Sequence, residues 1–200
     1  MAPMTLFPLI FFMMFFPFIS ACQKDDIAVY RVPKEFNETE GVPVPASAVE
    51  ANSQRDIEWV VPPSWRVQAP SEMRVGSFLR PGKNGHPADI SVVLLSGEAG
   101  GALANINRWR QQIQLPALSE SEWGKNTKTI SATGRKMIYV DMVSTEFLIE
   151  GKLRKRLIAA IYQQTQRTWF FKMSGEDESV KSAEPDFLAF LKSLQFKSEK

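Results

Sequence analysis

The chain has 200 residues, of which 44% are hydrophobic and 23% are charged, and its formal net charge is +2. This balance is typical of one globular domain with a further segment attached, and so small a positive charge argues against a nucleic-acid-binding protein. Cys22 is the only cysteine, which excludes an intrachain disulfide and a zinc site built from several thiolates.

The first feature along the chain is an uncharged apolar segment, Leu6–Ala21. It is rich in Phe, Met, Leu and Ile, but it is short and contains Pro8 and Pro17, so it is poorly suited to cross a membrane as a helix. An apolar segment of this length at the amino terminus is typical of a secretory signal peptide. No Lys or Arg precedes it, so only the terminal amine supplies the positive end of the signal.

The end of this segment, Ile19-Ser20-Ala21-Cys22, resembles the lipobox of bacterial lipoproteins. The resemblance implies that a signal peptide of residues 1–21 is removed and that Cys22 carries acyl chains, palmitate among them, which anchor the protein in a membrane. Gln23, rather than Asp, follows the cysteine. In bacteria with two membranes this implies the periplasmic side of the outer membrane, and otherwise the cell surface.

Residues 22–56 form a polar segment with few apolar residues and with prolines at Pro33, Pro43 and Pro45. Such a composition cannot bury enough apolar surface to fold alone. We therefore expect a flexible tether, about 30–35 Å long on average, between the lipidated Cys22 and a single folded domain that covers residues 57–196.

The folded domain is predicted to combine short strands with a few helices. Trp59 and Trp65 flank an extended proline pair and are expected to close one end of the core. Alternating and β-branched runs predict strands, and apolar residues at helical spacing predict helices. In chain order, the expected elements are strands at 66–68, 73–79 and 90–95, a helix at 102–114, a helical turn at 119–123, strands at 127–132, 136–143, 157–162 and 168–173, a short helix or loop at 176–183, and a terminal helix with Pro185 in its first turn.

The strand predicted at 136–143 is apolar on both faces. Its apolar residues on one face alternate with those on the other: Ile138, Val140 and Met142 alternate with Met137, Tyr139 and Val143. A strand of this kind is covered by a layer on each side of its sheet. We therefore expect an α+β fold in which helices cover both faces of an antiparallel sheet.

Three placements resemble the PsbP-like α/β/α sandwich: the Pro62-Pro63-Ser64-Trp65 opening, the strand Trp169–Gly175 and the amphipathic helix after it. The resemblance covers residues 57–196. It implies a domain that acts as an accessory or binding factor, although a fold does not by itself fix a function.

The candidate site lies at the start of the helix predicted at 102–114. Gly100 and Gly101 allow the backbone to reverse closely before it, and the helix projects Asn105, Arg108 and Gln112 opposite its apolar stripe. Backbone and side-chain donors in this pattern suit a protein partner or an anion. The alternative is that these residues form only a solvated helix face.

Other chemistry has little support in the sequence. His86 is the only histidine, and with Asp89 it offers fewer ligands than a closed metal site needs. No serine lies in a Gly-x-Ser-x-Gly motif, and no Gly-Lys-Ser/Thr follows the glycine turn as in a phosphate loop. We therefore assign no catalytic residue, metal or cofactor. The basic run Lys152–Arg156 is expected to be a solvated hairpin end, with contact to anionic headgroups as the alternative.

The sequence thus predicts a membrane-anchored lipoprotein of the cell envelope with a non-enzymatic domain that binds an envelope protein. A carrier of a small molecule or lipid, with a pocket between sheet and helices, is the main alternative. A carboxylate-based hydrolase is a third, because the members of a carboxylate pair meet only in three dimensions.

Overall fold

The computed structural model describes residues 57–69, 71, 73–82 and 85–197. All of them lie in the second of two compact units, Val44–Lys200. The expected signal peptide, the lipidated Cys22 and the tether up to residue 56 lie outside the described residues.

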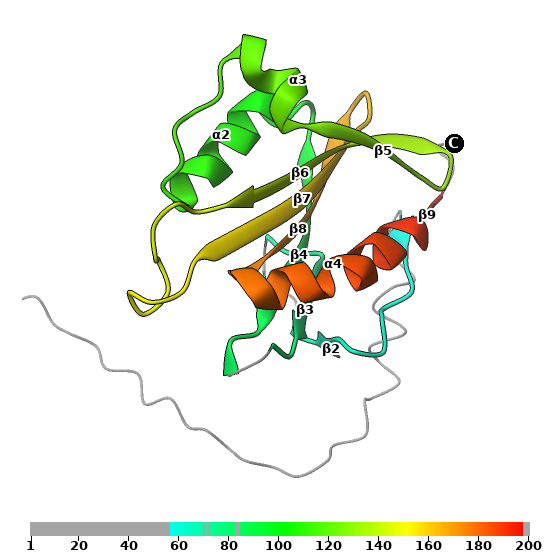
Figure 1. The fold of residues 1–200 in the computed structure, drawn as a ribbon. Coiled ribbons are helices and arrows are strands. Elements are labelled where there is room, and N and C mark those ends of the chain that lie inside the picture. Colours follow the sequence, from blue (N-terminus) through cyan, green and yellow to red (C-terminus); the bar gives the residue numbers. More distant parts are fainter. Residues whose placement is uncertain (1–56, 70, 72, 83–84, 198–200) are drawn as a thin grey trace, which may run out of the picture. The chain divides into compact units, whose positions relative to one another are not determined.

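The described chain is built on one seven-stranded antiparallel sheet (Figure 1). In spatial order its strands are β2 (Arg66–Val67), β3 (Gly76–Arg80), β4 (Ala88–Ser96), β8 (Arg167–Glu176), β7 (Lys155–Gln163), β6 (Arg135–Val143) and β5 (Lys128–Ala132). β1 (Ile57–Glu58) and β9 (Gln195–Phe196) form a separate antiparallel pair.

Helices cover both faces of the sheet (Figure 1). On one face lies α4 (Asp177–Lys192), and on the other lie α2 (Ala102–Gln112) and the short helices η2 (Glu120–Glu122) and α3 (Trp123–Asn126). The expected α+β fold, with helices on both faces of an antiparallel sheet, is confirmed. Of the described helices, none combines the length and the apolar character that crossing a membrane requires.

The alternation within β6 explains why the sheet needs both layers. Met137 and Tyr139 belong to the apolar cluster under α4, whereas Val140 and Met142 belong to the cluster under α2. Successive side chains of a strand point to opposite faces. A strand with apolar side chains on both faces would therefore expose one set of them to water unless a second layer covered it.

Aromatic rings fill both clusters. On the α4 side, the rings of Trp65 and Phe190 lie 5.1 Å apart between centroids, and Trp59 also packs against Phe190. On the α2 side, Trp109 meets Phe170 edge to face at 5.8 Å. The two indoles near the start of the domain are thus part of this core cluster, as their aromatic character predicts.

The carboxyl-terminal helix differs from the prediction. We expected a helix with Pro185 in its first turn, but α4 is one 16-residue helix that contains this proline in its interior. A proline inside a helix removes one hydrogen bond and normally interrupts the helix. Here Val180 before Pro185 and Phe187 after it are both fully buried, so packing on the sheet stabilises a continuous helix on both sides of the proline. Pro185 itself lies on the exposed side of α4.

Candidate functional site

The glycine turn between β4 and α2 forms the first part of the site. Gly100 has a φ of 81°, and Gly101, the N-cap of α2, has a φ of 82° and a ψ of 158°. The backbone conformation of Gly101 is essentially confined to glycine. The predicted need for glycine at this reversal is therefore confirmed.

Asn105 holds this turn in place. Its Nδ2 donates hydrogen bonds of 2.8 Å to the carbonyl oxygens of Ala99 and Gly101, and the residue is only 3% exposed. The helical projection placed Asn105 on the exposed face, and that placement is wrong. The reason is that the turn folds back over this flank of α2, where the side-chain amide donates to two backbone carbonyl groups of the turn.

Arg108 and Gln112 remain exposed on α2. The Nη1 atom of Arg108 donates a 2.8 Å hydrogen bond to Oδ1 of Asn105. Asn105 therefore links the glycine turn to an exposed guanidinium group. The structure brings Gly100, Gly101, Asn105 and Arg108 together, and the expected contact of these residues with a partner or an anion stays a prediction.

The other flank of α2 fastens the loop that follows the helix. Asn107 exchanges two hydrogen bonds with the backbone of Leu118, at 2.7 and 3.0 Å. Arg110 is 9% exposed, and its Nε donates to the carbonyl oxygen of Pro116 at 2.6 Å. Burial lowers the pKa of Arg110. These polar side chains thus serve the fold and are not available to a partner.

A groove of about 380 Å³ opens beside α2. It is lined by Ala102, Leu103, Glu120, Trp123, Ile138 and Gln163. These residues come from α2, η2, α3, β6 and β7, so the groove combines an apolar floor with one carboxylate and one amide. The sequence allows for a pocket between sheet and helices but does not identify these lining residues, because the helical turn predicted at 119–123 does not indicate which strands it packs against.

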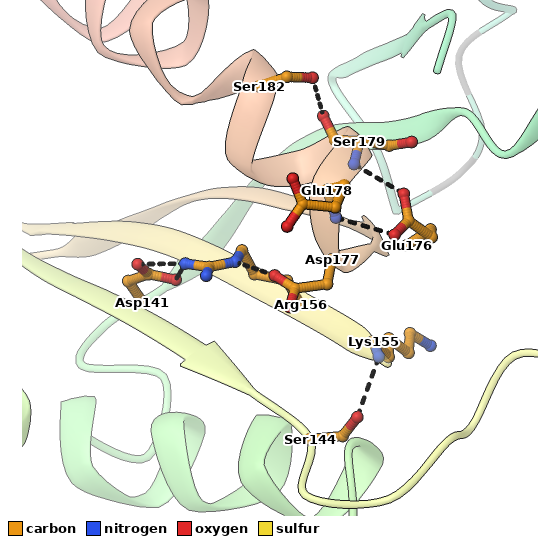
Figure 2. Close-up of polar contacts among 9 residues, drawn as sticks. All are labelled: Asp141, Ser144, Lys155, Arg156, Glu176, Asp177, Glu178, Ser179 and Ser182. Carbon is orange, nitrogen blue, oxygen red and sulfur yellow. Dashed lines mark hydrogen bonds and ion pairs between the residues drawn. The ribbon is translucent and has the colours of Figure 1, made fainter. Parts of the chain in front are cut away.

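Arg156 connects β6, β7 and the start of α4 (Figure 2). Its Nη1 contacts both carboxylate oxygens of Asp141, at 2.6 and 2.7 Å, and its Nε donates to Asp177 at 2.7 Å. Burial opposes the charge of Arg156, but the hydrogen bond to Asp177 and the charge of Asp141 outweigh it, so the pKa of Arg156 is raised. Arg156 is thus not part of a solvated hairpin end, unlike the exposed Lys152 and Arg154.

The carboxylates of this region are engaged by other groups. Asp141 and Asp177 share the guanidinium of Arg156, and Glu184 accepts a 2.7 Å hydrogen bond from the hydroxyl of Tyr139. Burial and the contact with Glu184 raise the pKa of Tyr139. A pair of glycosidase carboxylates instead faces a space that a substrate can enter, so this cluster is suited to joining elements.

One of the two residues considered as metal ligands, Asp89, is engaged by a cation of the protein. Asp89 forms a two-pronged ion pair with Arg74, at 2.8 and 3.0 Å. The hydrogen bond to Asp89 raises the pKa of Arg74. Within the part of the chain that the structure describes, no three His, Cys, Asp or Glu residues gather as a metal site would require.

Comparison with known proteins gives distant structural matches. No family model and no curated protein matches the sequence. Among solved structures, the sandwich fold is similar to LpqN of Mycobacterium tuberculosis, which is involved in cell envelope biogenesis (TM-score 0.47, 12% identity, 71% of this chain and 83% of LpqN). It is also similar to the cyanobacterial PsbP of Synechocystis (TM-score 0.44, 12% identity, 70% of this chain and 86% of that one).

A further similar structure comes from Bacteroides thetaiotaomicron, with a TM-score of 0.43 and 13% identity over 72% of this chain and 46% of that one. These similarities are distant and concern the fold alone. They include the PsbP fold that the sequence resembles, and they assign no function or lipid anchor to this chain.

Proposed function

We propose that this protein is a lipid-anchored component of the cell envelope whose folded domain binds another envelope protein and has no catalytic role. The anchor is supported by the sequence, in which an apolar leader ends at the only cysteine, Cys22. The binding role is supported by α2, where Arg108 and Gln112 stay exposed while Asn107 and Arg110 are used within the fold.

The observation that carries the binding role is the attachment of Arg108. Its guanidinium group is hydrogen-bonded to Asn105, which is itself fixed to the glycine turn. A side chain that is already held in place loses less conformational entropy on binding than a free one. Arg108 forms no ion pair with any described residue, so its charge is available to an acidic group of a partner.

The charges around α2 favour a partner with an acidic segment. No carboxylate occurs in the sequence between Glu98 and Glu120, and α2 contains Arg108 and Arg110, of which only Arg108 is exposed. A guanidinium group binds carboxylates through paired hydrogen bonds. We therefore expect the partner to place an Asp or Glu side chain against Arg108.

The substitution Arg108→Glu tests this proposal. The side chain is exposed, so the variant is expected to fold with an unchanged melting temperature, while attraction to an acidic partner becomes repulsion. Proximity labelling in the native envelope is expected to recover the partner with the wild-type protein and to lose it with the variant. Arg66→Glu, which changes another exposed arginine on β2, is the control and should retain the partner. Equal recovery with Arg108→Glu would contradict the proposal.

The groove beside α2 is the observation that favours the second candidate function, a carrier of a small molecule or lipid. Its volume of about 380 Å³ suits a small ligand. It lies open at the surface, whereas the two layers between sheet and helices are filled by large side chains such as Trp109 and Phe190. A carried ligand would therefore remain partly in solvent, which makes this function the weaker of the two.

A further inference from the structure

On the face of the sheet that α2 covers, the part of β8 toward its carboxyl end carries polar side chains. Phe170 packs under α2 against Trp109, and Lys172, two residues later, emerges on the same face because side chains alternate along a strand. In the register of the sheet, Lys172 lies beside Ser91 of β4, and Ser91 lies beside Ser77 of β3. Polar side chains thus form a row across three strands.

Lys172 is partly buried in this row. Its ammonium group makes no hydrogen bond or ion pair with any residue that the structure describes. The carboxylate that influences it, Asp89, is occupied by Arg74. Burial and the charges of Arg74 and Lys155 lower the pKa of Lys172, against the opposing charge of Asp89. A partly buried cation without a partner is unfavourable, and an anion would relieve it.

A second ammonium group, that of Lys155, belongs to the same cluster. Lys155 pairs with Glu176 in the register of β7 and β8, but the carboxylate of Glu176 accepts hydrogen bonds from the amides of Glu178 and Ser179 instead (Figure 2). The side chain of Lys155 therefore has no ion pair within the described residues. Along β8, Ser174 lies between the row of Lys172 and the row of Lys155.

We propose that Lys155 and Lys172, together with the hydroxyl groups of Ser91 and Ser174, bind the phosphate group of a phosphomonoester. Arg74 and Asp89 neutralise each other, and the carboxylate of Glu176 is held by backbone amides at the start of α4. Lys155 and Lys172 are therefore the two cations of this cluster without an ion pair to any described residue, and a phosphate dianion can pair with both. Ammonium and hydroxyl groups donate hydrogen bonds to phosphate oxygens. No described residue uses the hydrogen-bonding capacity of these four side chains.

Two sources can supply this chemistry. One is a soluble phosphomonoester, and the other is a lipid with a phosphomonoester headgroup in the membrane to which the protein is anchored under the proposed function. Both require the same contacts with Lys155 and Lys172. The experiment therefore uses inorganic phosphate as the soluble probe and compares vesicles of phosphatidylcholine with and without phosphatidic acid.

The test is a phosphate titration of the full chain, followed by NMR. Phosphate replaces chloride in the buffer so that the ionic strength stays constant. We expect saturable shifts at Ser91 and Ser174 and a rise in the pKa of Lys172 as phosphate binds. Lys172→Met, which keeps the length of the side chain, is expected to weaken phosphate binding at least tenfold. Lys136→Met, which removes an exposed lysine of β6, is the control and should bind phosphate as the wild type does.

The outcomes separate the alternatives. Sedimentation with phosphatidic acid vesicles that requires Lys172 identifies a headgroup, whereas phosphate binding without such sedimentation identifies a soluble ligand. If Lys172→Met does not fold, the test is the change in the pKa of Lys172 that phosphate causes in the wild-type protein. An unchanged pKa in saturating phosphate, or shifts that persist in a folded Lys172→Met variant, overturn the proposal. Arg108→Glu should still bind phosphate, so failure of the partner proposal would leave this result intact.

Discussion

Gly101 fixes the start of α2 through its backbone alone. A Cβ atom added at Gly101 would meet nothing within 4 Å, so space does not forbid a side chain there. Its φ of 82° and ψ of 158° nevertheless lie in a region that costs other residues on the order of 1–3 kcal/mol. The requirement for glycine is therefore conformational.

Gly101→Ala is accordingly expected to lower the free energy of unfolding by about 1–3 kcal/mol, measured by urea denaturation. Gly124→Ala is the matched control, because Gly124 in α3 also has open space around its Cα but has no positive φ. That change should be neutral or raise stability by about 0.5–1 kcal/mol, since alanine favours the helix. Similar losses in both variants would show that the conformation of Gly101 is not the cause.

Asn105 and Lys172 show which properties of single residues the sequence does not contain. A helical projection predicts the direction in which Asn105 points from the axis of α2. It does not predict that the glycine turn folds over that side of the helix. Likewise, nothing near Lys172 in the sequence indicates that Arg74 occupies Asp89. The candidate residues Arg108 and Gln112 could be predicted because exposure on an amphipathic helix depends on local spacing.

At the scale of elements, local signals predicted the hairpins well and α4 less well. The β5–β6 hairpin turns at Thr133 and Gly134, both with positive φ, and such turn residues are visible in a sequence. Pro185 is an equally clear local signal, yet α4 continues through it, because burial of Val180 and Phe187 outweighs the local preference. Tertiary packing of this kind is not contained in a window of sequence.

The start of α4 depends on Glu176, which is 8% exposed. Its side chain accepts hydrogen bonds of 2.9 and 2.7 Å from the amides of Glu178 and Ser179. Burial alone would raise the pKa of Glu176, but these hydrogen bonds to the charged form outweigh it, so the pKa is lowered from its ordinary value of 4.5. The cap therefore stabilises the fold fully above about pH 4.5, and this contribution is lost as the pH falls through the lower folded value.

Glu176→Gln is expected to lower the free energy of unfolding by about 1 kcal/mol at pH 7, as the loss of a helix cap typically does. The difference from the wild type should shrink as the pH falls from about 4.5 to the lower pKa of the folded state, below which the wild-type carboxylate is also neutral. Thermal unfolding between pH 7 and pH 3 measures this. Glu178→Gln, whose exposed side chain does not cap the helix, should show a smaller effect. A difference that is constant with pH would contradict the role of the charge.

At the scale of the whole molecule, the two helical layers come from different places in the chain. α2 lies between β4 and β5 and covers one face, whereas α4 follows β8 and covers the other. The need for two layers could be predicted from the strand at 136–143, which is apolar on both faces. The strand order could not, because the pairing of β4 with β8 joins residues more than 70 positions apart, such as Val93 and Phe170.

The last prediction concerns the anchor, which depends on the sequence alone. Each buried methylene of an acyl chain contributes about 0.8 kcal/mol, and one chain holds a protein only marginally, so stable anchoring needs at least two chains. Intact mass spectrometry of the membrane fraction should therefore find a polypeptide that begins at Cys22 and carries the mass of two or three acyl chains.

Cys22→Ser should carry no acyl mass. It should nevertheless keep the thermal unfolding transition of the folded domain, because Cys22 lies outside residues 57–196. An uncut wild-type chain without acyl groups would contradict the proposed anchor, while the partner and phosphate experiments would still stand, since both are read from residues of the folded domain.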